Sequence, residues 1–164
     1  SLGIHLFDLT TGQDRPFLHR GRHVYGRDPR WSPDGTAFAL IEFAEGRRVA
    51  IYGLRDSSLR VAVPSTQDEI RTLQWVSPAV FGRLQLAFRR VTGPDFASYL
   101  VDPDGSHLQR LAYNVLWSFF SPVRPELLTG GWSGPDSLGV VWVDWITKDG
   151  IVWGRRLTKW LPPP

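Results

Sequence analysis

Residues 28–40 read DPRWSPDGTAFAL: a large aromatic residue, a turn signal and then an apolar run. Ser-Pro followed by Asp-Gly favours a tight turn, because Pro fixes φ and Gly accepts a left-handed backbone. Residues 36–43 continue as a short apolar run rich in β-forming residues, which favours a strand. The stretch therefore predicts two strands joined by a tight turn.

The same pattern of short runs and turns continues along the chain, and helical periodicity is nearly absent. Residues 48–52 form another β-type run, and 66–72 is the one segment with the character of a helical turn. The runs are separated by turn signals at Thr11-Gly12, Pro33-Asp34-Gly35, Glu45-Gly46, Gly93-Pro94-Asp95, Pro103-Asp104-Gly105 and Asp149-Gly150. This spacing predicts an all-β sandwich, barrel or propeller.

An internal repeat favours the propeller. Trp31, Trp75 and Trp117 are 44 and 42 residues apart, and a second landmark recurs at positions 8, 53, 102 and 144. Both series share a period of about 45 residues, which is the length of one four-stranded propeller blade.

The repeat resembles that of TolB-like, WD-repeat-like β-propellers, whose pattern is P-x-W-S-P-D-G-x-x-[IL]-A-[FY]. Residues 49–54 are similar to the strand that follows this pattern, and propeller domains of prolyl-oligopeptidase-like peptidases share it. The second unit has residues 79–82 in place of the Asp-Gly turn, and the third diverges further. The positions that carry the resemblance are Trp31, Ser32, Pro33, Asp34, Gly35, Trp75, Ser77, Pro78, Trp117, Ser121 and Pro122.

The repeat phase predicts a partial β-propeller over residues 1–160, made of four-stranded antiparallel blades in an incomplete ring. We expect the Trp residues to fill the wedges between blades, and the strand after the Asp-Gly turn to be buried on both faces. The predicted parts are an outer half-blade (3–18), three blades (28–64, 70–112 and 114–157) and a Pro-rich tail (161–164).

Such a partial ring would expose apolar sheet faces and strand edges. Further sequence, a second copy or a partner subunit would then complete it, so we expect a homo-oligomer or a subunit of a larger assembly. The absence of Met and the start at Ser1 indicate a processed chain or a piece of a longer one.

Composition excludes several classes of protein. The net charge of +3 is small, and the basic residues are interspersed with carboxylates, so nucleic acid is not an expected partner. The chain contains no Cys, which excludes disulfides and thiolate chemistry. It also has no apolar run of the length that a transmembrane helix needs.

No catalytic, metal or cofactor site is predicted. His19 and His23 have the spacing of a helical metal pair, but Gly21 and two arginines place them in a loop. Residues 131–135 lack the second Gly and the context of a nucleophile elbow. Residues 102–105 lack most oxygen ligands of a calcium loop, so a turn is expected.

The predicted binding surface is the segment 20–28, read as an inter-blade loop, with residues 65–69 and 113–114 in similar loops. Cationic and aromatic side chains together suit acidic or aromatic groups of a protein or peptide. The candidate residues are Arg20, Arg22, His23, Tyr25 and Arg27.

The sequence therefore favours a non-enzymatic protein-interaction or scaffold module. One alternative is a propeller fragment of a prolyl-oligopeptidase-like hydrolase whose catalytic domain is absent here. Another is a structural subunit of a larger complex. The family resemblance implies an extracytoplasmic or periplasmic location, and fold alone does not decide among these functions.

Overall fold

The computed structural model describes residues 3–78, 82–113, 117–121, 126–133, 138–147 and 150–159. The elements in these ranges are all β-strands, and twelve of them form three four-stranded antiparallel sheets. This confirms the all-β prediction and the four-stranded antiparallel units.

Two short hairpins precede the sheets. In the first hairpin, β1 (His5–Phe7) pairs with β2 (Asp14–Pro16). In the second, β3 (Leu18–His19) pairs with β4 (Arg22–His23).

Each larger sheet is built from four consecutive strands in chain order. The first sheet consists of β5 (Gly26–Trp31), β6 (Ala37–Phe43), β7 (Arg47–Gly53) and β8 (Leu59–Thr66). The second consists of β9 (Glu69–Val76), β10 (Gln85–Thr92), β11 (Asp95–Val101) and β12 (Gln109–Tyr113). The third consists of β13 (Trp117–Phe120), β14 (Glu126–Ser133), β15 (Leu138–Thr147) and β16 (Gly150–Lys159).

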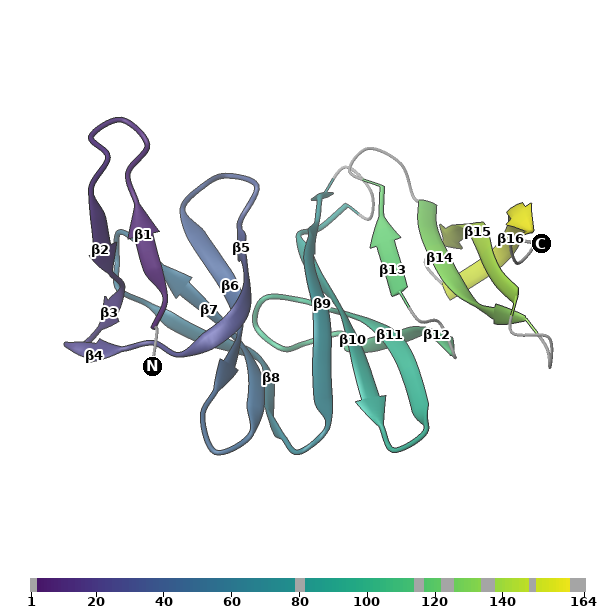
Figure 1. Cartoon of the computed structure of the whole chain (residues 1–164), viewed down its shortest axis with the longest axis horizontal. Helices are drawn as coiled ribbons and strands as arrows, with labels where there is room; N and C mark the ends of the chain where they lie inside the picture. Colours follow the sequence, from purple (N-terminus) through teal and green to yellow (C-terminus); the bar gives the residue numbers. More distant parts are fainter. Residues whose placement is uncertain are drawn as a thin grey trace.

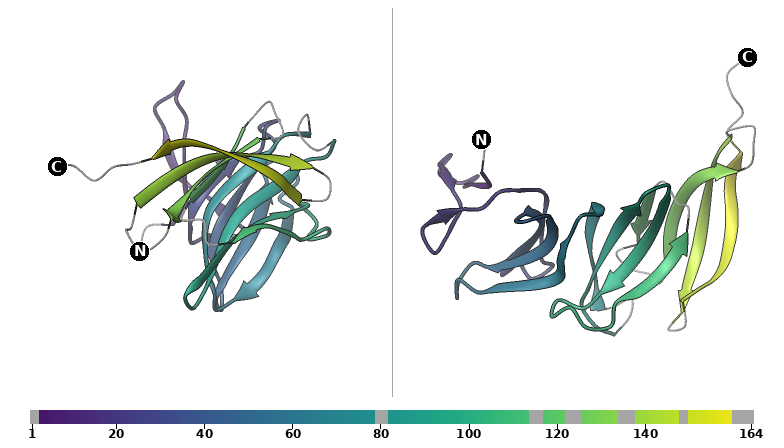
Figure 2. Two further views of the ribbon diagram at one scale, coloured as in Figure 1. Left: turned by 90° about the vertical axis from the view of Figure 1, so that its right-hand side faces the viewer. Right: turned by 90° about the horizontal axis from the view of Figure 1, so that it is seen from below.

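The three sheets stand in a row, with the hairpin β1–β2 at one end and β16 at the other (Figures 1 and 2). The first strand of each sheet lies beside the first strand of the next, so β9 lies between β5 and β13. The part of the chain that the structure describes forms an open row and does not close into a ring.

Strand β6 is buried on both faces, as its uninterrupted apolar sequence predicts. Phe38 and Leu40 pack toward the N-terminal hairpins, whereas Ala39 and Ile41 pack toward the second sheet. All four side chains are buried. The main apolar core therefore lies between the first two sheets, and a second core lies between the first sheet and the hairpins.

The predicted turn between β5 and β6 is present. Ser32 donates its backbone N–H to the Ala37 carbonyl (2.9 Å), and Ala37 N–H donates to Ser32 Oγ (3.0 Å). Asp34 Oδ1 accepts from Ser32 Oγ (2.6 Å) and from Thr36 N–H (3.1 Å). Gly35 has a φ of 68°, the left-handed conformation that glycine adopts most easily. Ser32, Asp34 and Gly35 therefore each stabilise the turn.

Three predictions of local structure are wrong. Residues 20–28 are not one loop, because residues 22–23 form β4 and residues 26–31 form β5. Left-handed backbone at Arg20 and Gly21 lets the chain reverse and pair with itself. Residues 66–72 form no helical turn, and residues 65–69 are not one loop, since β8 and β9 leave only residues 67–68 between them.

Candidate interaction surfaces

Four of the five candidate binding residues lie together on the second hairpin and just after it. Arg20 is in the turn, Arg22 and His23 are in β4, and Tyr25 follows. All four are exposed, and the His23 and Tyr25 rings lie 6.2 Å apart. Among the residues that the structure describes, no carboxylate lies within ion-pair distance of Arg20 or Arg22. We call these four residues the hairpin face.

The fifth candidate, Arg27, does not join them. It lies in β5 and reaches the second sheet, where its guanidinium donates to the Ile70 carbonyl (2.8 Å) and to Glu69 (3.2 Å). Arg71 also donates to Glu69 (2.6 Å), and this bond, followed by the one from Arg27, lowers the pKa of Glu69 to about 2. Arg27 is therefore a link between two sheets.

Further side chains join the first strands of neighbouring sheets, and sequence reasoning did not find them. Leu73 N–H donates to Asp28 (3.0 Å), and Arg30 donates to the Leu73 carbonyl (2.9 Å). Between the second and third sheets, the Gln74 amide both donates to the Phe120 carbonyl (2.9 Å) and accepts from its N–H (3.0 Å). Their place in the repeat could have indicated them, because Arg30 and Gln74 each directly precede a repeated Trp.

The repeated Trp residues differ in environment. Trp75 is partly buried against the core between the first two sheets, and its indole N–H donates to the Arg30 carbonyl (2.9 Å). Trp31 is 57% exposed. The predicted wedge position is therefore correct for Trp75 and wrong for Trp31, since only the short hairpins precede the sheet that carries it. The side chain of Trp117 and all of Pro122 lie outside the described residues.

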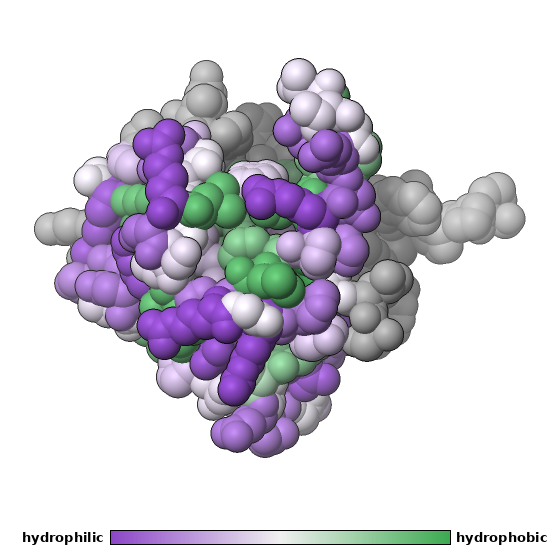
Figure 3. Space-filling view, turned by 90° about the vertical axis from the view of Figure 1, so that its left-hand side faces the viewer, coloured by the Kyte–Doolittle hydropathy of each residue, from purple (hydrophilic) through white to green (hydrophobic). Residues whose placement is uncertain are grey.

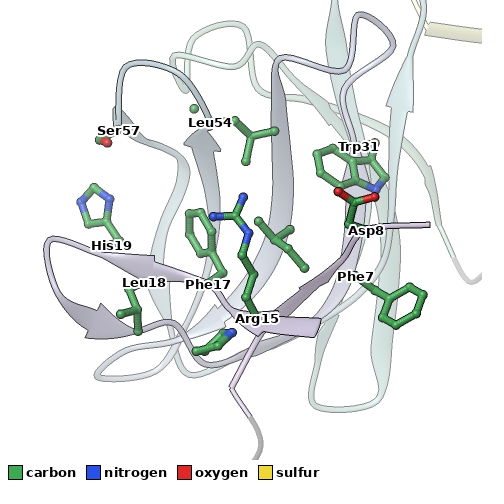
Figure 4. Close-up of a pocket in the computed structure, with 12 residues that line it drawn as sticks. Phe7, Asp8, Arg15, Phe17, Leu18, His19, Trp31, Leu54 and Ser57 are labelled. Atoms are coloured by element: carbon green, nitrogen blue, oxygen red, sulfur yellow. The ribbon is translucent and has the colours of Figure 1, made fainter. Parts of the chain in front are cut away.

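A groove of about 520 Å³ lies between the first hairpin and the first sheet (Figure 4). Leu6, Phe7 and Phe17 line it from the hairpin side, and Trp31 and Leu54 line it from the sheet. Figure 3 shows this end of the molecule, where hydrophobic side chains gather in the middle and hydrophilic ones surround them. We call the groove between the first hairpin and the first sheet the edge groove.

Two charged side chains belong to the edge groove. Asp8 is used by its own turn, where its carboxylate accepts from the N–H groups of Thr10 (2.8 Å) and Thr11 (3.1 Å). The bond from Thr11, then the bond from Thr10, and the nearby charge of Arg15 lower the pKa of Asp8. Arg15 extends into the groove (Figure 4), and within the described ranges no carboxylate lies at ion-pair distance from it. Arg15 attracts Asp8 without a direct ion pair, so its guanidinium can still form one with a ligand carboxylate.

One buried polar cluster stabilises the first sheet. Tyr52 donates its hydroxyl proton to Glu42 (2.7 Å), and Arg48 donates to the other oxygen of the same carboxylate. Burial, followed by the bond to Glu42, raises the pKa of Tyr52. Tyr52 is in the core between the first sheet and the hairpins, whereas the Arg48 side chain is 25% exposed.

The remaining motifs considered in the sequence lie in strands and turns where they are described. His19 and His23 were predicted to lie in a loop, but they lie in β3 and β4, and the His19 ring packs against Tyr52 at 5.2 Å. Residues 102–105 form a turn in which Gly105 N–H donates to the Asp102 carbonyl (2.9 Å). Ser133 ends β14, whereas residues 134–135 of the same motif lie outside the described residues, as does Asn114 of the predicted loop 113–114.

The described residues contain no candidate metal site and no candidate membrane helix. No three of their His, Asp and Glu side chains group closely enough to hold a metal ion. None of them belongs to a helix with the length and hydrophobicity needed to cross a membrane. In comparisons with known proteins, no protein-family model matches the chain, and no curated protein matches it.

Proposed function

We propose that this chain is a partial β-propeller that acts as a non-enzymatic interaction module, binding a protein or peptide through the hairpin face. The row of four-stranded sheets, with first strands side by side, supports the propeller reading. Side-chain bonds between those strands hold the sheets together as a scaffold.

The observation that carries the proposal is the contrast among arginines. Arg27, Arg48, Arg71 and Arg90 each have a carboxylate partner within the chain. The arginines of the hairpin face have no such partner among the described residues, and they lie beside exposed His23 and Tyr25. Unpaired guanidinium groups next to aromatic rings suit acidic and aromatic groups of a partner.

The test is a binding experiment with defined ligands. Acidic peptides that contain an aromatic residue are titrated against the chain, and binding is measured by fluorescence anisotropy. We expect the double substitution Arg20→Ala/Arg22→Ala to weaken binding by about tenfold or more, because charge-assisted hydrogen bonds are lost. Tyr25→Ala should weaken it as well.

Arg55→Ala is the matched control, since Arg55 is an exposed arginine outside the hairpin face. It should leave the affinity unchanged. Equal binding by wild type and the hairpin variants would overturn the proposal.

We further propose that the exposed N-terminal end is covered in an oligomer or a larger assembly. Light scattering over a range of concentrations measures this directly. A stable dimer would support self-association, whereas a monomer that leaves the end exposed would favour a different partner subunit.

A further inference from the structure

Strand β1 has one paired edge and one open edge. Asp8 N–H donates to the Gln13 carbonyl at 2.8 Å where the hairpin closes. Antiparallel pairing alternates, so the backbone groups of Leu6 also point toward β2, and those of His5 and Phe7 point the other way. Pro16 fits this register, because it stands opposite His5 in a pair that exchanges no hydrogen bonds. No described strand pairs with the outer edge of β1.

The corresponding edge in the first sheet is occupied. By the repeat, Phe7 corresponds to Tyr52 in β7. Strand β6 runs antiparallel along the edge of β7, with Phe38 opposite Tyr52. The repeat thus shows what an edge of this type pairs with: an extended strand that carries large apolar side chains.

The edge groove lies beside this open edge and contains apolar surface that such a strand would cover. Phe7 is 60% exposed and Trp31 is 57% exposed, and both line the groove. The matching indole, Trp75, is covered by the first sheet and donates to its backbone. A strand added to β1 would cover Trp31 in the way that the first sheet covers Trp75.

Charge adds a second requirement. Arg15 stands opposite Leu6 in the hairpin and therefore extends from the same face, into the groove. The Asp8 carboxylate accepts from its own turn and attracts Arg15 only at longer range, so no described carboxylate contacts the Arg15 guanidinium. An incoming strand with a carboxylate near Arg15 would form an ion pair with its guanidinium.

We propose that an extended segment of a partner protein adds as a strand to the open edge of β1, covering Trp31 with apolar side chains and pairing a carboxylate with Arg15. The proposal rests on the chain's function as an interaction module, but it concerns a surface separate from the hairpin face. This mode of recognition is β-strand addition, in which main-chain hydrogen bonds supply affinity and side-chain pockets supply specificity.

The probe is a fluorescein-labelled peptide with the sequence of residues 36–43, flanked by glutamates, because β6 is the strand that occupies the equivalent edge. Titration against the full chain is followed by anisotropy, and backbone amide exchange is followed by NMR. We expect saturable binding, together with slowed exchange at His5 and Phe7.

Two control peptides test the mode of binding. In the first, the peptide is N-methylated at the alternate residues whose N–H groups would face β1. It lacks the donors that pairing with β1 needs, so it should not bind. The peptide flanked by lysines should bind more weakly than the peptide flanked by glutamates, because it repels Arg15.

Protein variants test the surface. Arg15→Glu and Trp31→Ala should each weaken binding of the probe peptide by about tenfold or more. The double variant Arg20→Ala/Arg22→Ala should bind it as the wild type does. The two proposals can therefore fail separately. Loss of probe binding only in Arg20→Ala/Arg22→Ala would overturn strand addition and leave the hairpin face as the binding surface.

Three other outcomes would also overturn the inference. The first is binding without slowed exchange at His5 and Phe7, and the second is no binding up to the solubility limit of the peptide. The third is a dimer, seen by light scattering, that Trp31→Ala dissociates, because a second copy would then occupy the edge.

Discussion

The N-terminal hairpin and the outer half of the first sheet have related sequences but different surroundings. Tyr52, in β7, is 1% exposed, and Phe7, at the corresponding place in β1, is 60% exposed. Strand β6 pairs with β7 through seven residue pairs, while β1 pairs only with β2 among the described strands. The repeat therefore fixes the residue type, and the neighbouring strand decides whether that residue is buried.

The largest expected effect comes from truncating these two aromatic side chains. Tyr52→Ala should lower the free energy of unfolding by about 3–5 kcal/mol, because it leaves a cavity in the core and removes a partner of Glu42. Phe7→Ala should change it by less than about 0.5 kcal/mol. Urea denaturation of both variants gives the comparison. Similar losses at both positions would show that Phe7 is buried in solution.

Tyr52→Phe divides the larger effect into its parts. It keeps the ring and removes only the hydroxyl, so the Glu42 carboxylate loses one donor. Hydrogen bonds to charged groups contribute about 1.5–3 kcal/mol, and we expect a loss in that range. A smaller loss would indicate that packing of the ring accounts for most of the stability at this position.

The second comparison concerns the two Trp residues. Trp75→Phe removes the indole N–H that donates to the Arg30 carbonyl, so unfolding should become easier by about 1 kcal/mol. Trp31→Phe removes an exposed indole and should have little effect on the same measurement. The comparison fails if the two variants have equal midpoints in urea.

Sequence reasoning identified the fold class because its signals are local. Asp34 and Gly35 form the turn that their residue types predict, and the alternating faces of β6 follow from an uninterrupted apolar run. By contrast, the hairpin β3–β4 was missed because its strands have two residues each, too few for a periodic signal.

The candidate surfaces were predictable only in part. The residues of the hairpin face are close in sequence, so their grouping could be inferred. The edge groove joins Leu6, Trp31 and Leu54, which are far apart in the chain and meet only after the hairpin packs on the first sheet. The role of Arg27 depends on Glu69 in another sheet, which no local pattern reveals.

The smallest expected effect is on acid stability at the contact between β5 and β9. The pKa of Glu69 in the folded chain is about 2, below its ordinary value of 4.5, chiefly because Arg71 and then Arg27 donate to it. Because the pKa is lowered on folding, the Glu69 carboxylate stabilises the fold at pH values above its ordinary pKa. That contribution disappears as the pH falls from about 4.5 toward 2.

Glu69→Gln should therefore make unfolding less dependent on pH over this interval, as followed by thermal melts at a series of pH values. The change should be modest, since the ion pairs are partly exposed and solvent weakens them. Asp95→Asn, at an exposed position at the start of β11, is the control for loss of one negative charge. An unchanged acid slope in Glu69→Gln would show that the arginines do not stabilise this contact.

Because each large sheet is made of four consecutive strands, the molecule has a particular mechanical behaviour. A chain stretched from its two ends can lose one sheet without unthreading another, since each sheet begins and ends before the next one starts. The links between sheets at β5–β9 and β9–β13 would then resist force one after another. Extension should proceed in discrete steps, each releasing the length of one sheet.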